Sequence, residues 1–122
     1  PAMSEIGIKA LLMVFNIFAV FAIIALSVPL VKRQVKPNKT YGVRFKASFQ
    51  SDEAWYDINE FGGRSMIKWS LLILAITLFT PWLPVVEQEI WALIISLAPL
   101  LVLGSAWESW KFAKAWRPKG RS

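Results

Sequence analysis

Four charged side chains are the best candidates for chemistry in this sequence: Arg44, Asp57, Glu60 and Glu108. Asp57 and Glu60 lie three residues apart, a spacing that places both carboxylates on one face of a helix, as an acid–base pair would require. The guanidinium of Arg44 offers five donors in a planar fork that suits carboxylates. Glu108 lies at the end of an apolar run, where an acid can serve proton or ion transfer. The candidates therefore divide between proton transfer and charge pairing.

The rest of the composition favours charge pairing over catalysis. The chain has no Cys and no His, which removes thiolate nucleophiles, imidazole bases and the usual zinc and haem ligands. No serine–base pair, glycine-rich phosphate loop or metal-binding cluster is visible. Asp57 and Glu60 suit a solvated helix face, and we expect Glu108 to pair with Lys111 or a loop arginine. We expect a protein that is not an enzyme, with no catalytic residue, cofactor or metal site.

Three uncharged runs must position these residues, and they define the fold class. They are residues 10–31, 69–86 and 90–107. At a rise of about 1.5 Å per residue, such helices extend roughly 27–33 Å, close to a bilayer core of about 30 Å. Only 18% of the chain is charged. We predict an all-α integral membrane protein with a single membrane domain over 1–122 and transmembrane helices at about 8–31, 67–84 and 89–110.

The basic residues predict the orientation of the chain. Eight basic and four acidic residues lie between Lys32 and Lys68, and the tail after Glu108 carries five more basic residues. The turn between the second and third runs carries only two acids. The positive-inside rule therefore predicts an N-terminus outside, a cytoplasmic loop at 32–66 and a cytoplasmic tail at 111–122.

The first run is expected to remain in the protein. It is too long for a signal peptide and lacks a small-residue cleavage site. Pro1 and Ala2 are expected to precede a natural start at Met3.

Polar and irregular residues inside the spans are expected to serve packing. Asn16 should bond across a helix pair, at about 0.6 kcal/mol for an average bond of this kind. Pro81 and Pro84 predict a tight hairpin between the second and third helices. Pro99 should kink the third helix, and Gly104 permits the close approach of a neighbour. Small residues also favour association between helices, so a homo-oligomer is one expected state.

The net charge of +6 is expected to face lipid rather than nucleic acid. Basic side chains directly after a span meet anionic head groups, worth about 1 kcal/mol each near the surface. We therefore expect membrane lipids as partners and no nucleic acid.

The second half of the loop has the pattern of a short amphipathic helix. Ser51 can cap its first turn, and Gly62–Gly63 supplies a left-handed stop. Apolar residues share one face of the helix at i, i+3/4 and i+7 spacing: Ala54, Trp55, Ile58 and Phe61. We predict a short interfacial helix of about ten residues, whose apolar face must lie on the bilayer or against the span ends.

The first half of the loop is basic and aromatic. Pro37–Asn38 and Tyr41–Gly42 are turn sequences. Residues 43–49 alternate apolar and polar, which is typical of an extended segment, but the spacing of the aromatic residues also fits a helix. The secondary structure of this stretch is left open.

Arg44 has two interpretations. In the first, it pairs with Asp57, Glu60 or Glu108 and folds the loop against the helix ends, with Tyr41 and Trp55 as its apolar floor. In the second, it is solvated and contacts lipid phosphate.

Together these loop residues resemble a known signature. Pro37-Asn38-x-x-Tyr41-Gly42-x-Arg44 is followed by Ser51-x-Glu53-x-Trp55-x-x-x-Asn59 and Gly62–Gly63. This pattern is similar to that of the SdpI family of bacterial membrane proteins. The resemblance implies a bacterial cytoplasmic (inner) membrane location and a signature carried by a cytoplasmic loop between membrane helices.

The resemblance also implies a function. The best-known family member protects a cell from a secreted killing factor and relays its presence to a transcription regulator. We therefore expect a binding or protection module without catalysis, whose partner is a membrane-active toxin or a regulatory protein. The alternatives are a small structural subunit of a membrane complex, a self-assembling homo-oligomer, and a binder of lipid or a small hydrophobic molecule. The expected binding or structural residues are Pro37, Asn38, Tyr41, Gly42, Arg44, Trp55, Asn59, Gly62, Gly63 and Glu108.

Overall fold

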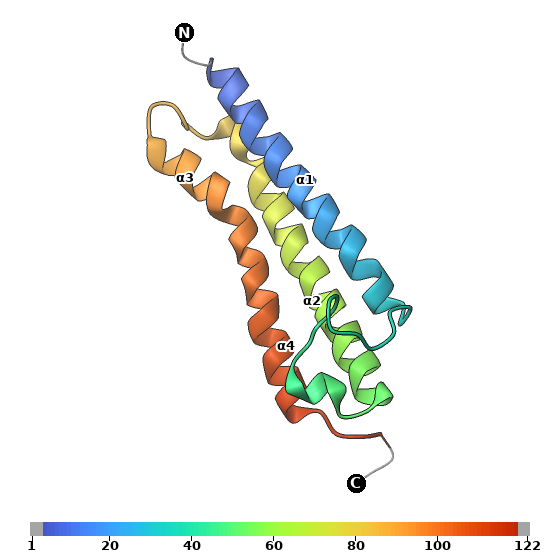
Figure 1. Cartoon of the computed structure of the whole chain (residues 1–122). Helices are drawn as coiled ribbons and strands as arrows, with labels where there is room; N and C mark the ends of the chain where they lie inside the picture. Colours follow the sequence, from blue (N-terminus) through green and yellow to red (C-terminus); the bar gives the residue numbers. More distant parts are fainter. Residues whose placement is uncertain (1–3, 120–122) are drawn as a thin grey trace.

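Three long helical segments run side by side along the molecule (Figure 1). The computed structural model describes residues 4–119; the expected start at Met3 and the last three residues of the tail lie outside this range. The described residues contain no strand. The segments, with 3-10 helices labelled η, are α1 (Glu5–Val31), η1 (Lys46–Phe49), α2 (Asp52–Leu78), η2 (Thr80–Trp82), α3 (Glu89–Leu97), η3 (Ala98–Val102) and α4 (Leu103–Ala115).

All three segments are long and apolar enough to cross a membrane, the third being α3, η3 and α4 in succession. Large apolar side chains point outward from α1: Phe15, Phe18 and Phe21 are 59–74% exposed. Exposing such a side chain to water costs about 1.5–3 kcal/mol, whereas contact with lipid tails carries no such penalty. The prediction of an all-α multi-pass membrane protein is confirmed.

α2 occupies the middle of the bundle, between α1 and the third segment (Figure 1). Asn16 of α1 joins all three, because its Nδ2 donates to Thr77 Oγ1 of α2 at 3.1 Å and to the Ile95 carbonyl of α3 at 2.8 Å. A buried apolar cluster of Val20 and Ile73, which also includes a residue of η3, joins the same three segments. The expected role of Asn16 in packing is confirmed, and it extends to a third helix.

The predicted short loop helix is not a separate element. Ser51 caps it as expected, since its hydroxyl accepts from Ala54 N at 3.0 Å, but the helix continues through Gly62–Gly63 to Leu78 as α2. The predicted stop is wrong. A Cβ on Gly63 would lie 2.9 Å from the Ser27 carbonyl oxygen, so this glycine allows α1 and α2 to approach closely instead of ending a helix.

α2 is therefore longer than a membrane span requires. Its 27 residues rise about 40 Å, roughly 10 Å more than the hydrocarbon core. The predicted span over 67–84 covers only its second half and continues into η2, so we expect the first half to project beyond the bilayer core. That projecting half is the surface on which the loop folds.

The third segment is irregular where proline predicts it. The α-helical pattern gives way to the 3-10 helix η3 around Pro99, which has no N–H to donate to the preceding turn. Gly104 lies one turn later, and a Cβ there would stand 2.6 Å from the Trp69 ring. The expected close approach at Gly104 is confirmed, and its neighbour is Trp69 of α2.

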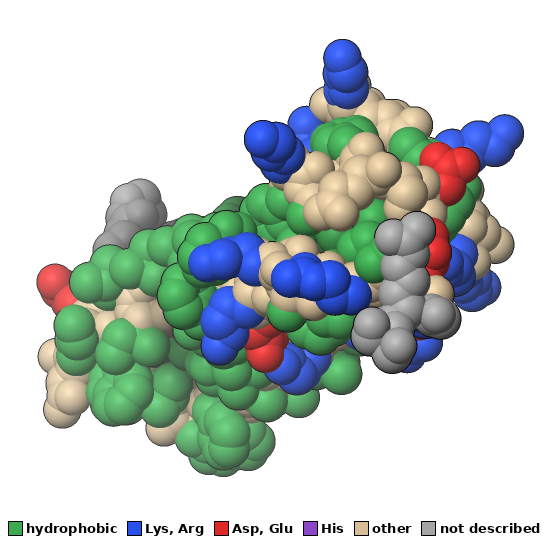
Figure 2. Space-filling model, turned by 90° about the horizontal axis from the view of Figure 1, so that it is seen from below, with side chains coloured by type: hydrophobic (Ala, Val, Ile, Leu, Met, Phe, Trp, Pro, Cys, Tyr) green, Lys and Arg blue, Asp and Glu red, His purple; other side chains and the backbone are tan. Residues whose placement is uncertain are grey.

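The two ends of the bundle differ in character. At the turn end, the connection 79–88 reverses the chain, and Lys9 Nζ of α1 donates to the Pro81 carbonyl at 2.8 Å. The opposite end, here called the loop end, comprises the loop 32–51, the first half of α2 and the tail after α4. Figure 2 looks toward the loop end and shows Lys and Arg side chains gathered around it. The predicted site residues lie there, with Glu108 further along the bundle toward the span.

Candidate functional site

Trp55 anchors the loop on α2. It is fully buried, and its Nε1 donates to the Val35 carbonyl at 2.8 Å. The centroids of the Trp55 and Phe49 rings lie 5.4 Å apart. Because Val35 and Phe49 stand near the two ends of the loop, Trp55 holds both ends against one turn of α2. Burying an aromatic ring of this size makes it a large contributor to the packing of this region.

Asn59 binds the middle of the loop through backbone groups. Its Oδ1 accepts from Val43 N at 2.6 Å, while its Nδ2 donates to the Trp55 carbonyl at 2.9 Å and the Val43 carbonyl at 3.3 Å. The side chain is nearly fully buried. The amide thus satisfies both backbone groups of Val43, which lies in an irregular part of the loop with no strand beside it.

Gly42 is required for this contact. Its φ is +120°, a conformation that side chains disfavour. A Cβ at this position would lie 2.6 Å from Asn59 Oδ1 and 3.2 Å from the Trp55 ring. Backbone conformation and space therefore both exclude a larger residue beside the Asn59–Val43 bonds.

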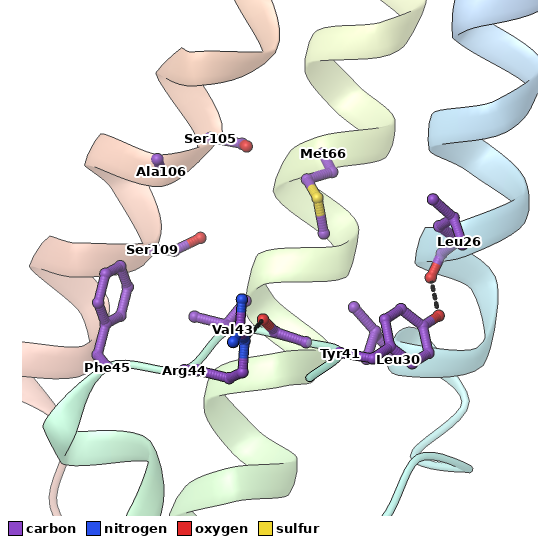
Figure 3. Close-up of a pocket in the computed structure, with 11 residues that line it drawn as sticks. Leu26, Leu30, Tyr41, Val43, Arg44, Phe45, Met66, Ser105, Ala106 and Ser109 are labelled. Atoms are coloured by element: carbon purple, nitrogen blue, oxygen red, sulfur yellow. Dashed lines mark hydrogen bonds between the residues drawn. The ribbon is translucent and has the colours of Figure 1, made fainter. Parts of the chain in front are cut away.

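Asn38 and Tyr41 shape the turn that leads into Gly42. Asn38 Oδ1 accepts from Thr40 N at 2.9 Å and Tyr41 N at 2.7 Å, the pattern of an Asx turn. Pro37 precedes this turn and limits the backbone freedom of the chain entering it. The Tyr41 hydroxyl donates to the Leu26 carbonyl of α1 (Figure 3). The loop is thereby tied to α1 as well as to α2.

Gly62 and Gly63 provide the surfaces on which the loop and α1 lie. A Cβ on Gly62 would stand 2.4 Å from Val43 Cγ2, and Gly63 faces α1 as described above. Seven of the predicted residues therefore form one contiguous structure, here called the signature cluster: Asn38, Tyr41, Gly42, Trp55, Asn59, Gly62 and Gly63.

Arg44 does not make the predicted carboxylate pair. Its Nη1 donates to the Lys39 carbonyl at 2.7 Å and its Nε to the Gly42 carbonyl at 3.4 Å. Among residues 4–119 it forms no salt bridge. The reason is geometric: Gly42 and Val43 bind α2 so closely that the next side chain is directed away from the carboxylates. Arg44 is exposed, as its second interpretation requires.

Arg33 takes the place predicted for Arg44. Its Nη1 lies 3.0 Å from Asp57 Oδ1 and 3.2 Å from Glu60 Oε1, and its guanidinium lies 5.4 Å from the centre of the Tyr56 ring. Desolvation lowers the pKa of Arg33, but its bonds to the two carboxylates outweigh this and leave the pKa raised. In the sequence, the position of Arg33 just after the first span could have indicated that this residue, and not Arg44, pairs with the carboxylates.

The tail also binds the first half of α2. Trp116 is buried among Ala54, Ile58 and Ala113, and its Nε1 donates to Asp57 Oδ2 at 3.0 Å. Burial raises the pKa of Asp57, but the hydrogen bonds from Trp116 and Arg33 outweigh it, so the pKa lies below its usual value. Trp116 was not predicted as a site residue. The predicted apolar face of the loop helix is confirmed, and it lies against the loop, the end of α4 and the tail.

Glu108 is paired, as expected, but with different partners. Its Oε1 accepts from Ser65 Oγ at 2.7 Å and Trp69 Nε1 at 2.6 Å, and its Oε2 accepts from Lys68 Nζ at 2.7 Å. The predicted partner Lys111 instead lies over a tryptophan ring of α4, 5.6 Å from its centre. Glu108 therefore joins α4 to α2.

A cavity lies beside the signature cluster, between α1, α2, α4 and the loop (Figure 3). Its volume is about 390 Å³. Its walls are mainly apolar and include Leu26, Leu30, Val43, Phe45, Met66 and Ala106. The charged or hydroxyl-bearing members of its lining are Tyr41, Arg44, Ser105 and Ser109. It is called the loop-end cavity below.

One comparison with known proteins matches this chain, that with the protein families. No curated protein and no solved structure matches it. The model of the SdpI/YfhL protein family matches residues 34–107, which is more than half of the sequence and contains every residue of the signature cluster. Membership in this family suggests an immunity-type membrane protein. By this match, the chain belongs to the SdpI/YfhL protein family.

Proposed function

We propose that the protein is a protection module of a bacterial inner membrane, which binds a membrane-active toxin or senses envelope stress without catalysing a reaction. One observation carries the proposal: the family match contains the whole signature cluster, and these residues converge on one ordered structure at the loop end. Most of their bonds fix backbone, as in Asn59 to Val43. Such an arrangement supports the presentation of a surface.

The carboxylates that could serve catalysis are engaged in structure. Asp57 and Glu60 share Arg33, and Asp57 also accepts from Trp116. Glu108 accepts from three donors of α2. A general acid or base needs a group that can exchange a proton with substrate, so these contacts favour a binding role over an enzymatic one.

The same proposal includes an orientation. The loop end carries the basic loop and the basic tail (Figure 2), and the positive-inside rule assigns such segments to the cytoplasm. The turn end, with its two acids, would face outward. A toxin arriving from outside would then meet the turn end and the lipid-facing helices first, whereas a regulatory protein would meet the signature cluster.

Survival of a sensitive bacterium tests the proposal. Cells expressing the protein are challenged with membrane-active killing peptides, and survival is compared at equal membrane abundance for wild type, Asn59→Ala and Gln34→Ala. Gln34 is an exposed amide of the same loop and serves as the matched control. We expect protection by wild type and Gln34→Ala, and its loss in Asn59→Ala. Unchanged killing across a panel of such peptides would contradict protection, and a partner that co-purifies in stoichiometric amount would then favour the accessory-subunit alternative.

A further inference from the structure

We propose that the loop-end cavity holds one acyl chain of an anionic phospholipid from the surrounding leaflet, and that Arg44 binds the lipid phosphate. This site is separate from the protective function, and it stands whether or not the protein confers immunity. Four features of the cavity lead to this occupant: its walls, its opening, the charge at its rim and an unpaired hydroxyl.

The walls are suited to a hydrocarbon chain. Leu30 and Met66 line the cavity from α1 and α2, and Phe45 lines it from the loop. Cavities that hold small ligands usually measure about 300–1,000 Å³, so 390 Å³ is enough for a slender ligand and too little for a folded partner.

The opening faces the region where lipid lies. Leu26 of α1 is 59% exposed, and Ala106 of α4 is also exposed; both line the cavity. These residues belong to two of the membrane-crossing segments. A molecule can therefore enter sideways from the bilayer, which favours a lipid over a ligand dissolved in water.

The rim carries a positive charge that no described carboxylate neutralises. The described bonds of the Arg44 side chain go to two backbone carbonyls, which leave the guanidinium charge in place. The nearby acids are engaged by Arg33 and Lys68. An exposed guanidinium beside an apolar cavity matches the phosphate of an anionic amphiphile, because arginine and phosphate form bidentate, charge-assisted hydrogen bonds.

A buried hydroxyl at the cavity fits a ligand with oxygen atoms beyond its phosphate. Ser109 is 1% exposed, and its Oγ has no hydrogen-bond partner among the described residues. Ser105, one turn away, is satisfied by the Val102 carbonyl at 2.6 Å. Figure 3 shows the Ser109 oxygen directed toward the cavity, with Arg44 nearer the loop end. An ester carbonyl following a phosphate held at Arg44 would accept from this hydroxyl.

Native mass spectrometry of the full chain tests this site. The protein is reconstituted in phosphatidylcholine bilayers containing a minor fraction of phosphatidylglycerol, then released and scored for bound phosphatidylglycerol. The variants are Arg44→Gln, Ala106→Phe and Lys36→Gln. Ala106→Phe fills the opening with no change of charge, and Lys36→Gln removes an equal charge from the same loop away from the cavity.

We expect wild type and Lys36→Gln to retain phosphatidylglycerol equally. Arg44→Gln should bind it about tenfold more weakly, as the loss of a charge-assisted bond implies, and Ala106→Phe should lose it while circular dichroism and thermal unfolding stay unchanged. Equal retention by all four proteins, or no retention by wild type, would overturn the proposal. Competition by inorganic phosphate alone, with no effect of Ala106→Phe, would also overturn it and indicate a free-phosphate site.

Discussion

Replacing Asn59 with alanine should release the loop from α2 while the three spans remain folded. The substitution removes the only described acceptor of Val43 N, at 2.6 Å, and the donor to the Val43 carbonyl. A buried donor left without a partner costs about 1–3 kcal/mol, and each neutral bond lost contributes about 0.5–1.5 kcal/mol. We therefore expect the loop to be destabilised locally by about 2–3 kcal/mol, which raises its open population roughly 30- to 150-fold.

Limited trypsin digestion in detergent measures this opening. The loop contains Lys39, Arg44 and Lys46, so an opened loop gives a cut between α1 and α2. The cleavage rate should rise in proportion to the open population when cleavage is slow relative to closing. Circular dichroism should stay unchanged, because the spans do not depend on Val43.

The matched control is Gln34→Ala, which removes an exposed amide from the same loop and should leave the rate at the wild-type value. If Asn59→Ala is cut no faster than Gln34→Ala, the Asn59–Val43 bonds do not hold the loop, and the reasoning fails.

Three further predictions follow from the same geometry. Gly42→Ala should raise the cleavage rate of the loop at least tenfold in the same digestion, because its Cβ would lie 2.6 Å from Asn59 Oδ1. Cleavage at the wild-type rate would contradict the requirement for glycine at this position. Glu108→Ala should lower the free energy of unfolding in detergent by about 2–3 kcal/mol, because its hydrogen bonds are lost. Glu108→Gln should lose only the partly exposed ion pair, which is worth about 0.2–1 kcal/mol. Equal losses in the two variants would disprove the assigned contacts. The pKa of Asp57 is lowered in the folded protein. Its stabilising contribution should therefore be complete above the unfolded-state pKa of about 3.9, and it should disappear as the pH falls through the lower pKa of the folded state. Thermal stability below pH 4 should therefore fall more steeply for wild type than for Asp57→Asn, and parallel curves would refute this.

Hydropathy and local helix chemistry made much of the fold predictable. Runs of uncharged residues identify membrane spans, because an unsatisfied or charged group is expensive in lipid. The Ser51 cap and the helical face of Trp55 and Ile58 depend only on residues within a few positions. These predictions are confirmed because the interactions behind them are local in sequence.

Contacts between distant segments were harder to predict. Glycine permits both a helix end and close packing, and only the positions of α1 and Val43 show which applies to Gly62 and Gly63. The choice of Arg33 over Arg44 as the carboxylate partner depends on where the loop leaves α1. Spacing showed which residues could pair, but the path of the backbone decided which pairs formed.

Cross-linking of the loop to α2 tests the central claim most directly. A Cβ on Gly62 would lie 3.6 Å from Val43 Cβ, within the usual disulfide range of about 3.5–4.5 Å, and the native chain has no cysteine to interfere. Membranes carrying Val43→Cys with Gly62→Cys are oxidised mildly and digested with trypsin. The control pair is Val43→Cys with Arg64→Cys, because the exposed Arg64 lies on another face of α2 and Gly62 is kept. Trypsin cuts after Arg44 and Lys46 lie between the two positions. We expect the fragment that carries position 43 to stay joined to the α2 fragment until reduction in the first pair alone. Fragments that separate without reductant in both pairs would contradict a loop held on α2.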